Sequence, residues 1–265
     1  MFPLNSILYN TPSPVICIVL LIAIYFFYLI GTRLGSYQKI KNPESKSEGA
    51  GLLGGSLMGL LALLLSFTFS MSASRFDDRR ATIIHEANTI GTAVLRADLY
   101  PDSIRNEFRK DFKSYVESRI SYYDAGNDEI KISAALKEAT KISERIWQRA
   151  SLLSIRSSSV MPHSQVIPAL NDMIDAVTTR DAARFFRVPD PIMWLLIILT
   201  ILESLIIGYA KKEKRNDWII LILYSVMTVF TIFTIMDLDR PRTGIIKTET
   251  ANQKIIELRE MFKKP

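Results

Sequence analysis

The sequence is constrained most strongly by four segments that are almost purely apolar: Pro14–Ile30, Leu52–Met71, Pro191–Tyr209 and Trp218–Met236. Each segment has close to the ~20 residues that a helix needs to cross roughly 30 Å of hydrocarbon. The chain between the second and third segments, residues 75–187, is rich in charge. The sequence therefore predicts a membrane protein with four spans and one sizeable extramembrane domain.

The extramembrane domain shows helical periodicity throughout. Within residues 101–124, apolar side chains recur at three- and four-residue steps, which is typical of an amphipathic helix; they are Ile104, Phe108, Phe112, Tyr115, Val116 and Ile120. Further helices are predicted over residues 128–154 and, after a polar break, around residues 167–177. No stretch alternates with the period of two that indicates strands. We predict an all-α fold.

The second span is predicted to continue beyond the membrane as one long helix, from about Leu52 to Leu99, and to leave the bilayer near Ser74. Its outer half contains no proline, and its one glycine, Gly91, costs a helix only about 1 kcal/mol. The chain is thereby divided into the first two spans, the helical domain, the last two spans and a C-terminal tail, which are residues 1–74, 75–187, 188–240 and 241–265.

Lysine and arginine in short loops predict the orientation in a cell (inner) membrane. The loops 32–48 and 211–217 are both basic, and with four spans they share a side. The positive-inside rule places both loops in the cytoplasm and the domain, residues 75–187, on the opposite face. The net charge of +6 also suits anionic lipid headgroups as partners.

The second span carries small and hydroxyl-bearing residues at helical spacing. One interpretation is close packing between membrane helices, through Gly51, Gly54, Gly55, Gly59 and Ala62. The other is a polar path for an ion, with hydroxyl groups supplied by Ser66, Ser70 and Ser74. A neighbouring face could form a hydrophobic constriction from Leu63, Phe67 and Met71. Both interpretations can hold around a symmetric axis.

Glu203 is the charged residue within the third span. Acids inside membranes are costly and usually face protein or water. Glu203 is therefore either a proton or cation site, or it lies near enough to the cytoplasmic end to pair with the basic run "KKEKR" that begins at Lys211.

A charge-dense run, "DLDRPR", follows the fourth span and is level with "SRFDDRR" at the exit of the second span. We hypothesise a clamp of ion pairs between the two runs. In this clamp Asp237 and Asp239 accept from Arg75, Arg79 or Arg80, whereas Arg240 and Arg242 reach Asp77, Asp78 or Glu86. Pro241 would fix the angle of the exit. The alternative is a stop signal of solvated charges.

The sequence gives little support to an enzyme, a metal site or a nucleic-acid site. It contains no phosphate-binding glycine loop and no metalloprotease or hydrolase motif. One cysteine and two histidines make a Cys/His metal site improbable, and two acids beside two arginines make a poor cation cage. We predict no catalytic residue, no cofactor, no metal and no nucleic acid.

Two runs resemble a known family: "GLLALLLSFTFSMSASRFDDRRATIIHEANTIGTAVLRADLYP" and, much later, "DLDRPRTGII". They are similar to bacterial multi-pass membrane proteins whose shared domain was long of unknown function and is described as bestrophin-like. The resemblance covers the chain from about Gly51 onward. A further basic residue often follows "DLDRPR" in that pattern, and Thr243 stands there in this sequence.

The resemblance implies a homo-oligomeric channel. Bestrophins are pentameric anion channels, conducting ions such as chloride, in which the second membrane helices line the pore around a hydrophobic neck. They also keep their helical domain in the cytosol, whereas the loop charges here predict the opposite face. Both orientations stay open at this point.

Three functional hypotheses follow. The first is an ion channel, with copies of the chain, lipids and inorganic ions as its partners. The second is a non-conducting structural or signalling module whose helical domain binds a partner. A transporter ranks third, because four spans without a pair of discontinuous helices fit it poorly.

Overall fold

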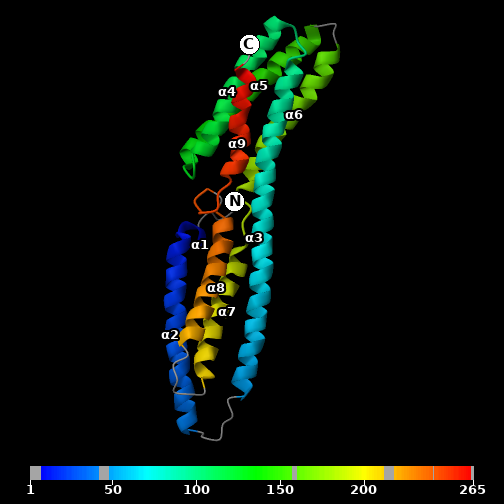
Figure 1. Cartoon of the computed structure of the whole chain (residues 1–265). Coiled ribbons are helices and arrows are strands. Elements are labelled where there is room, and N and C mark those ends of the chain that lie inside the picture. Colours follow the sequence, from blue (N-terminus) through cyan, green and yellow to red (C-terminus); the bar gives the residue numbers. More distant parts are fainter. Residues whose placement is uncertain (1–6, 42–47, 157–159, 212–217, 241, 264–265) are drawn as a thin grey trace. The chain divides into compact units, whose positions relative to one another are not determined.

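In a computed structural model of the chain, residues 7–41, 48–156, 160–211, 218–240 and 242–263 are described. They form helices and no strand, which confirms the all-α fold (Figure 1). The helices are α1 (Ile7–Asn10), α2 (Ser13–Lys41), α3 (Glu48–Ala97), α4 (Asp102–Asp124), α5 (Glu129–Arg156), α6 (Val160–Ala183), α7 (Asp190–Tyr209), α8 (Trp218–Leu238), α9 (Glu249–Glu257) and the 3-10 turn η1 (Leu258–Phe262).

The chain divides into two compact units. Unit 1 consists of residues 1–74 and 187–240, and unit 2 of residues 75–186 and 241–265. Helix α3 contributes its first half to unit 1 and its second half to unit 2. It is 50 residues long and begins and ends within a few residues of the predicted long helix.

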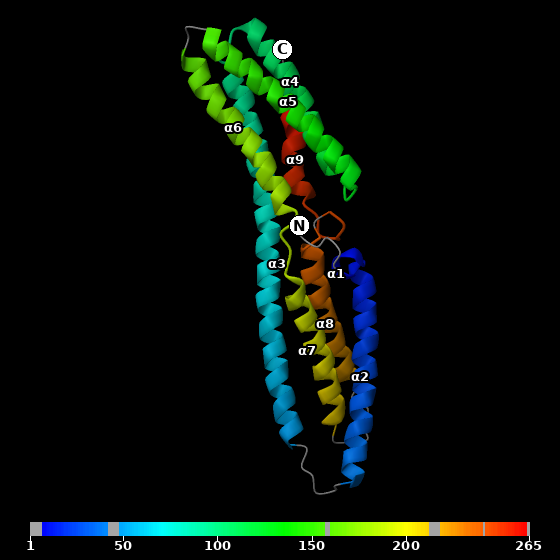
Figure 2. The same cartoon turned by 180° about the vertical axis from the view of Figure 1, so that it is seen from behind.

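Unit 1 contains the predicted spans. Four helices are long and apolar enough to cross a membrane, at Ser13–Gln38, Gly51–Ala97, Asp190–Tyr209 and Leu221–Leu238. The four-span prediction is therefore confirmed. Helices α2, α7 and α8 lie side by side in both views (Figures 1 and 2), and they share one apolar core with Leu61 of α3.

Helices α2 and α7 approach closely because three glycines lie between them. A Cβ atom added at Gly31 would lie 2.1 Å from the carbonyl oxygen of Leu205, and one at Gly208 would lie 2.3 Å from that of Tyr28. At Gly35 the added Cβ would lie 2.4 Å from the Tyr209 carbonyl oxygen. Only glycine fits such contacts, because a real Cβ atom never comes this near to a backbone oxygen.

Unit 2 is a helical domain around one main core. The stripe predicted in residues 101–124 forms part of that core: Phe108, Phe112, Tyr115, Val116 and Ile120 are buried, and Ile104 packs against them. Helix α5 adds Ile142, Ile146 and Ala150, and α6 adds Leu170. The amphipathic periodicity therefore identified the buried faces correctly.

The C-terminal tail belongs to unit 2, although the sequence analysis set it apart. Ala251 and Ile255 of α9 are buried in the unit 2 core. Arg109 of α4 donates to the carbonyl oxygen of Met261 at 2.9 Å, and Arg259 pairs with Glu117 of α4. These contacts attach both α9 and η1 to α4.

Candidate functional site

The outer face of α3 carries every residue that we predicted to line a pore. Leu63, Phe67 and Met71 are exposed in the single chain, Phe67 with 61% of its surface free. Ser66, Ser70 and Ser74 are exposed as well. Because all six belong to consecutive helical turns, α3 presents a continuous strip of hydroxyl groups beside a strip of large apolar groups.

The opposite face of α3 is the one that packs within unit 1. Leu61, Thr68 and Ser72 are buried there. The Ser72 hydroxyl donates to the carbonyl oxygen of Ile235 at 2.9 Å and contacts Asp239 Oδ1 at 3.3 Å. Within unit 1, α3 therefore packs through this face and leaves the face that carries Phe67 uncovered.

The small residues predicted for helix packing differ in how closely they contact other helices of the chain. Gly54 is buried, and an added Cβ would lie 3.1 Å from Ile206. A Cβ at Gly51, Gly55 or Gly59 would meet nothing within 4 Å, and Ala62 is exposed. Within the protomer the close glycine contacts lie instead between α2 and α7, so packing through the remaining α3 glycines stays a prediction.

Glu203 of α7 is buried within unit 1. Its side chain is 1% exposed, and among the described residues its Oε2 atom has no hydrogen-bond partner. Most of the basic run proposed as its partner, residues 212–215, lies outside the described part of the chain. The choice between an ion site and an ion pair with that run therefore stays open.

Asp239, in the "DLDRPR" run, collects hydrogen bonds inside unit 1. Its Oδ2 accepts from the Val188 backbone N–H at 2.6 Å and from the Tyr9 hydroxyl at 3.0 Å. Tyr9 also lies within hydrogen-bond distance of the Val188 carbonyl oxygen, at 2.7 Å. This carboxylate thus joins the end of α8 to Val188, two residues before α7, and to α1.

Arg240 fastens the same end of unit 1 to the N-terminal segment. It donates to the carbonyl oxygens of Leu8 and, at 2.7 Å, Thr11. Its guanidinium lies 5.8 Å from the centre of the Tyr9 ring, and Arg187 lies 4.7 Å from the same ring. Burial lowers the pKa of Arg240, although Tyr9 opposes that decrease.

In the predicted clamp, several charges have other partners. Arg240 bonds to the N-terminal carbonyls described above, and Arg242 donates to the Gly126 carbonyl oxygen at 2.6 Å. Glu86 pairs with two arginines of unit 2 that the clamp did not include. A pairing of Asp237 or Asp239 with Arg75, Arg79 or Arg80 would join the two units and stays a prediction. Pro241 lies outside the described residues.

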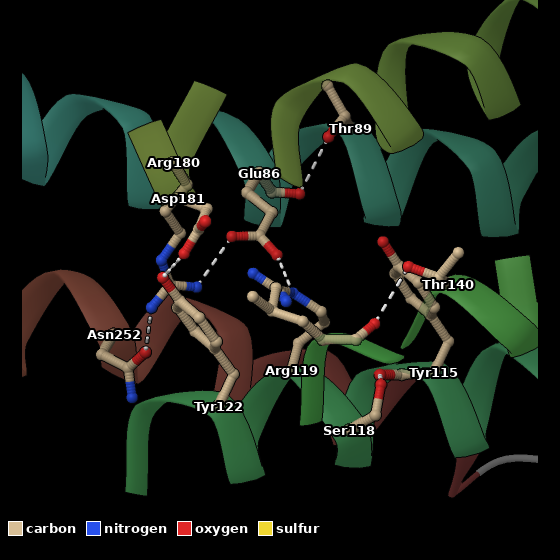
Figure 3. A network of polar contacts seen from close by, with 11 residues as sticks. Glu86, Thr89, Tyr115, Ser118, Arg119, Tyr122, Thr140, Arg180, Asp181 and Asn252 are labelled. Carbon is tan, nitrogen blue, oxygen red and sulfur yellow. Dashed lines mark hydrogen bonds and ion pairs between the residues drawn. The ribbon is translucent and has the colours of Figure 1, made fainter. Parts of the chain in front are cut away.

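A buried ion-pair network occupies the centre of unit 2 (Figure 3). The Glu86 carboxylate, 0% exposed, accepts from Arg119 Nε and, at 2.7 Å, from Arg180 Nη1. Arg180 Nη2 donates to Asn252 Oδ1 of α9 at 3.2 Å. The network therefore links α3, α4, α6 and α9 by charge as well as by apolar packing.

The aromatic ring of Tyr122 completes the network. The guanidinium carbons of Arg119, Arg180 and Arg242 lie 4.5, 5.2 and 4.6 Å from the ring centre. The Tyr122 hydroxyl donates to Asp181 at 3.0 Å. Burial would lower the pKa of Arg119, but the Glu86 carboxylate outweighs it and raises that pKa, so the pair stays charged.

Comparisons with known proteins identify the family of this chain. A family model of the bestrophin-like domain matches residues 17–253, which is most of the chain. The chain belongs to the bestrophin-like family.

Solved structures of a bacterial bestrophin homologue have the same fold as this bestrophin-like protein. The crystal structure of a bacterial bestrophin homologue from Klebsiella pneumoniae matches with a TM-score of 0.67 at 15% identity, covering 92% of this chain and 98% of that one. A variant of that homologue matches with a TM-score of 0.68 at 12% identity, covering 94% and 99%. No curated protein matched the chain. The resemblance seen in the sequence is therefore confirmed.

Sequence reasoning missed two features of this bestrophin-like protein. Gly31 and Gly35 are four residues apart in α2, which is the small-residue spacing typical of close helix contacts. Arg119 shares the spacing of Phe112, Tyr115 and Val116 in α4. A charge on an apolar stripe indicates a buried ion pair, and the structure supplies its partner, Glu86.

Proposed function

We propose that this bestrophin-like protein is a homo-oligomeric ion channel of the cell (inner) membrane whose pore is lined by α3. The observation that carries the proposal is the face of α3 left open by the protomer, which bears Ser66, Ser70 and Ser74 beside Phe67. Hydroxyl groups and exposed glycine backbone that face lipid tails add little to the stability of a membrane helix. They stabilise it more when neighbouring copies pack on the glycines and water hydrogen-bonds to the hydroxyl groups.

The chemistry of this face suits an anion such as chloride. Serine hydroxyl groups donate hydrogen bonds to an anion without placing a charge in the membrane. The large apolar side chains, one turn apart, would form a narrow neck that excludes water unless it opens. The family supports five copies around the pore, and the exposed Gly51, Gly55 and Gly59 supply small residues for contacts between them.

Changes on the proposed pore face are expected to alter ion flux in opposite directions. Ser66→Trp or Ser70→Trp should lower chloride flux into liposomes by roughly tenfold or more, because an indole ring blocks a narrow pore. Phe67→Ala should raise the chloride flux or make the channel leak, because the smaller side chain widens the neck. The flux of purified, reconstituted protein is compared with that of empty vesicles.

A matched control is Phe26→Ala, since Phe26 of α2 is exposed to a similar degree, 57%. It should leave flux unchanged. If Phe67→Ala behaves like Phe26→Ala in a conducting protein, α3 does not line the pore. If the wild type shows no flux of chloride or of cations, the non-conducting module becomes the better description.

The proposed orientation places loops 32–48 and 211–217 in the cytoplasm and unit 2 on the opposite face. It is tested with single cysteines at Asn127, an exposed residue, and at Glu213, which lies outside the described residues. In a Cys17→Ser background, an impermeant maleimide should label intact cells at position 127 and not at position 213. The reverse pattern would place the domain in the cytosol.

A further inference from the structure

Unit 2 contains a second feature that the proposed channel does not use. A small open pocket with about 40 Å³ of free volume is lined by Arg79, Arg180, Arg184, Arg242, Tyr122 and Tyr123, among others. Four guanidinium groups around one hollow concentrate positive charge there, so the pocket suits an anion.

Arg242 is the group in this pocket with the strongest need for a counter-charge. Among the described residues it forms no ion pair: its Nη1 donates to a backbone carbonyl, and its guanidinium lies over the Tyr122 ring. Burial lowers the pKa of Arg242, and the positive charges of Arg180 and Arg184 add to this decrease. A half-buried cation that other cations repel would be stabilised by a bound anion.

Two of the other arginines are held in place by hydrogen bonds within unit 2. Arg180 is fixed between Glu86 and Asn252, as Figure 3 shows. Arg79 donates to the carbonyl oxygens of Ala183 and Phe186. Guanidinium groups fixed in this way lose little freedom on binding.

Arg184 pairs with two carboxylates, one of which an anion can replace. Its Nε lies 2.9 Å from Asp181 Oδ1, and both of its terminal nitrogens bond to Glu129, at 2.9 and 3.1 Å. The Glu129 side chain is 67% exposed, and an ion pair with such a solvated carboxylate contributes little stability. Glu129 therefore acts as a weak internal competitor for the site.

We infer that this pocket binds a phosphate group. A phosphate offers several oxygens and more than one negative charge, and the planar fork of arginine matches it with paired hydrogen bonds. A halide is a single acceptor atom with one charge, so it cannot form these paired hydrogen bonds. The site does not depend on whether the protein conducts.

The phosphate can come from a lipid headgroup or from a soluble molecule. Three of the arginines are close in sequence to unit 1: Arg79 lies five residues after Ser74, Arg184 three before Arg187 and Arg242 two after Arg240. This places the site within a short length of chain from the membrane spans, so the test includes a lipid.

The experiment measures the unfolding temperature of the purified full-length protein in detergent. One arm adds inorganic phosphate or glycerol phosphate against chloride at equal ionic strength. The other arm adds dioleoyl phosphatidic acid against dioleoylglycerol, which has the same tails and no phosphate. We expect the phosphate-bearing member of at least one pair to raise the unfolding temperature, and the responding arm identifies the source.

Variants assign the effect to the pocket. Arg242→Gln and Arg184→Gln should each weaken the apparent affinity by about tenfold or more, because each removes a charged hydrogen-bond donor. Arg105→Gln, which alters a partly exposed arginine paired with Asp102, should have no effect. Glu129→Gln should tighten binding, a gain that damage to the fold cannot mimic.

The inference is overturned if neither phosphate arm stabilises the wild type. It is also overturned if Arg242→Gln and Arg184→Gln respond like the wild type, or if Glu129→Gln fails to tighten binding. Should Arg242→Gln not fold, Arg184→Gln and Glu129→Gln decide the question.

Discussion

Replacing Glu86 by glutamine is expected to destabilise unit 2 by about 3–5 kcal/mol, because it leaves two buried arginines without their counter-charge. Arg119 and Arg180 are 0% and 6% exposed, so water cannot replace the lost carboxylate. A loss of this size is a large part of the stability of an ordinary domain. It would appear as a strong decrease in the unfolding temperature of the detergent-solubilised protein.

The matched control is Glu117→Gln, which breaks another glutamate–arginine pair in the same unit. Glu117 and Arg259 are both about half exposed, at 45% and 46%, so water screens their pair and it should contribute little stability. A double variant, Glu86→Leu with Arg119→Leu, should recover part of the loss by removing one stranded charge. Equal shifts for Glu86→Gln and Glu117→Gln would contradict the importance of the buried network.

Replacing Gly208 by alanine is expected to separate α2 from α7 and to destabilise unit 1 by about 2 kcal/mol or more. The new Cβ atom would lie 2.3 Å from the Tyr28 carbonyl oxygen. Because this oxygen belongs to the backbone, no side-chain rotation relieves the contact. Gly31→Ala should have a similar effect, since its Cβ would lie 2.1 Å from the Leu205 carbonyl oxygen.

Gly49→Ala serves as the control, because a Cβ there meets nothing within 4 Å. It should leave the unfolding temperature and the yield of folded protein unchanged. Gly55→Ala, also open in the protomer, should affect only the assembly of copies. If Gly208→Ala unfolds at the wild-type temperature, the close approach of α2 and α7 is not what holds unit 1 together.

Much of this fold could be predicted from local pattern. The four spans, the length of α3 and the buried stripe of α4 all follow from the distribution of apolar residues along the chain. Such patterns report which surfaces avoid water, and that information is local. The short helix α9 was missed because nine residues give too little periodicity to distinguish a helix from a polar tail.

The partners of the charged side chains were harder to predict, because a charged residue can pair with any opposite charge that folding brings near. The "DLDRPR" run indicated a clamp, and within unit 1 its Asp239 and Arg240 do join elements, whereas the pairing with the exit of the second span stays a prediction. Asp239 accepts from Tyr9 and Val188, which are remote in sequence. Nothing local marks a backbone N–H or a distant tyrosine as the partner of a given carboxylate.

By itself, therefore, the sequence determined that this is an all-helical, four-span member of the bestrophin-like family, because hydrophobic periodicity and family motifs are properties of consecutive residues. Only the tertiary structure decided that Glu86 lies between Arg119 and Arg180, that the glycines of α2 and α7 meet, and that four arginines share one pocket. Each of these depends on which side chains from distant segments come within a few ångströms of one another. The packing of the folded helices sets those distances, and they cannot be read from the order of the residues alone.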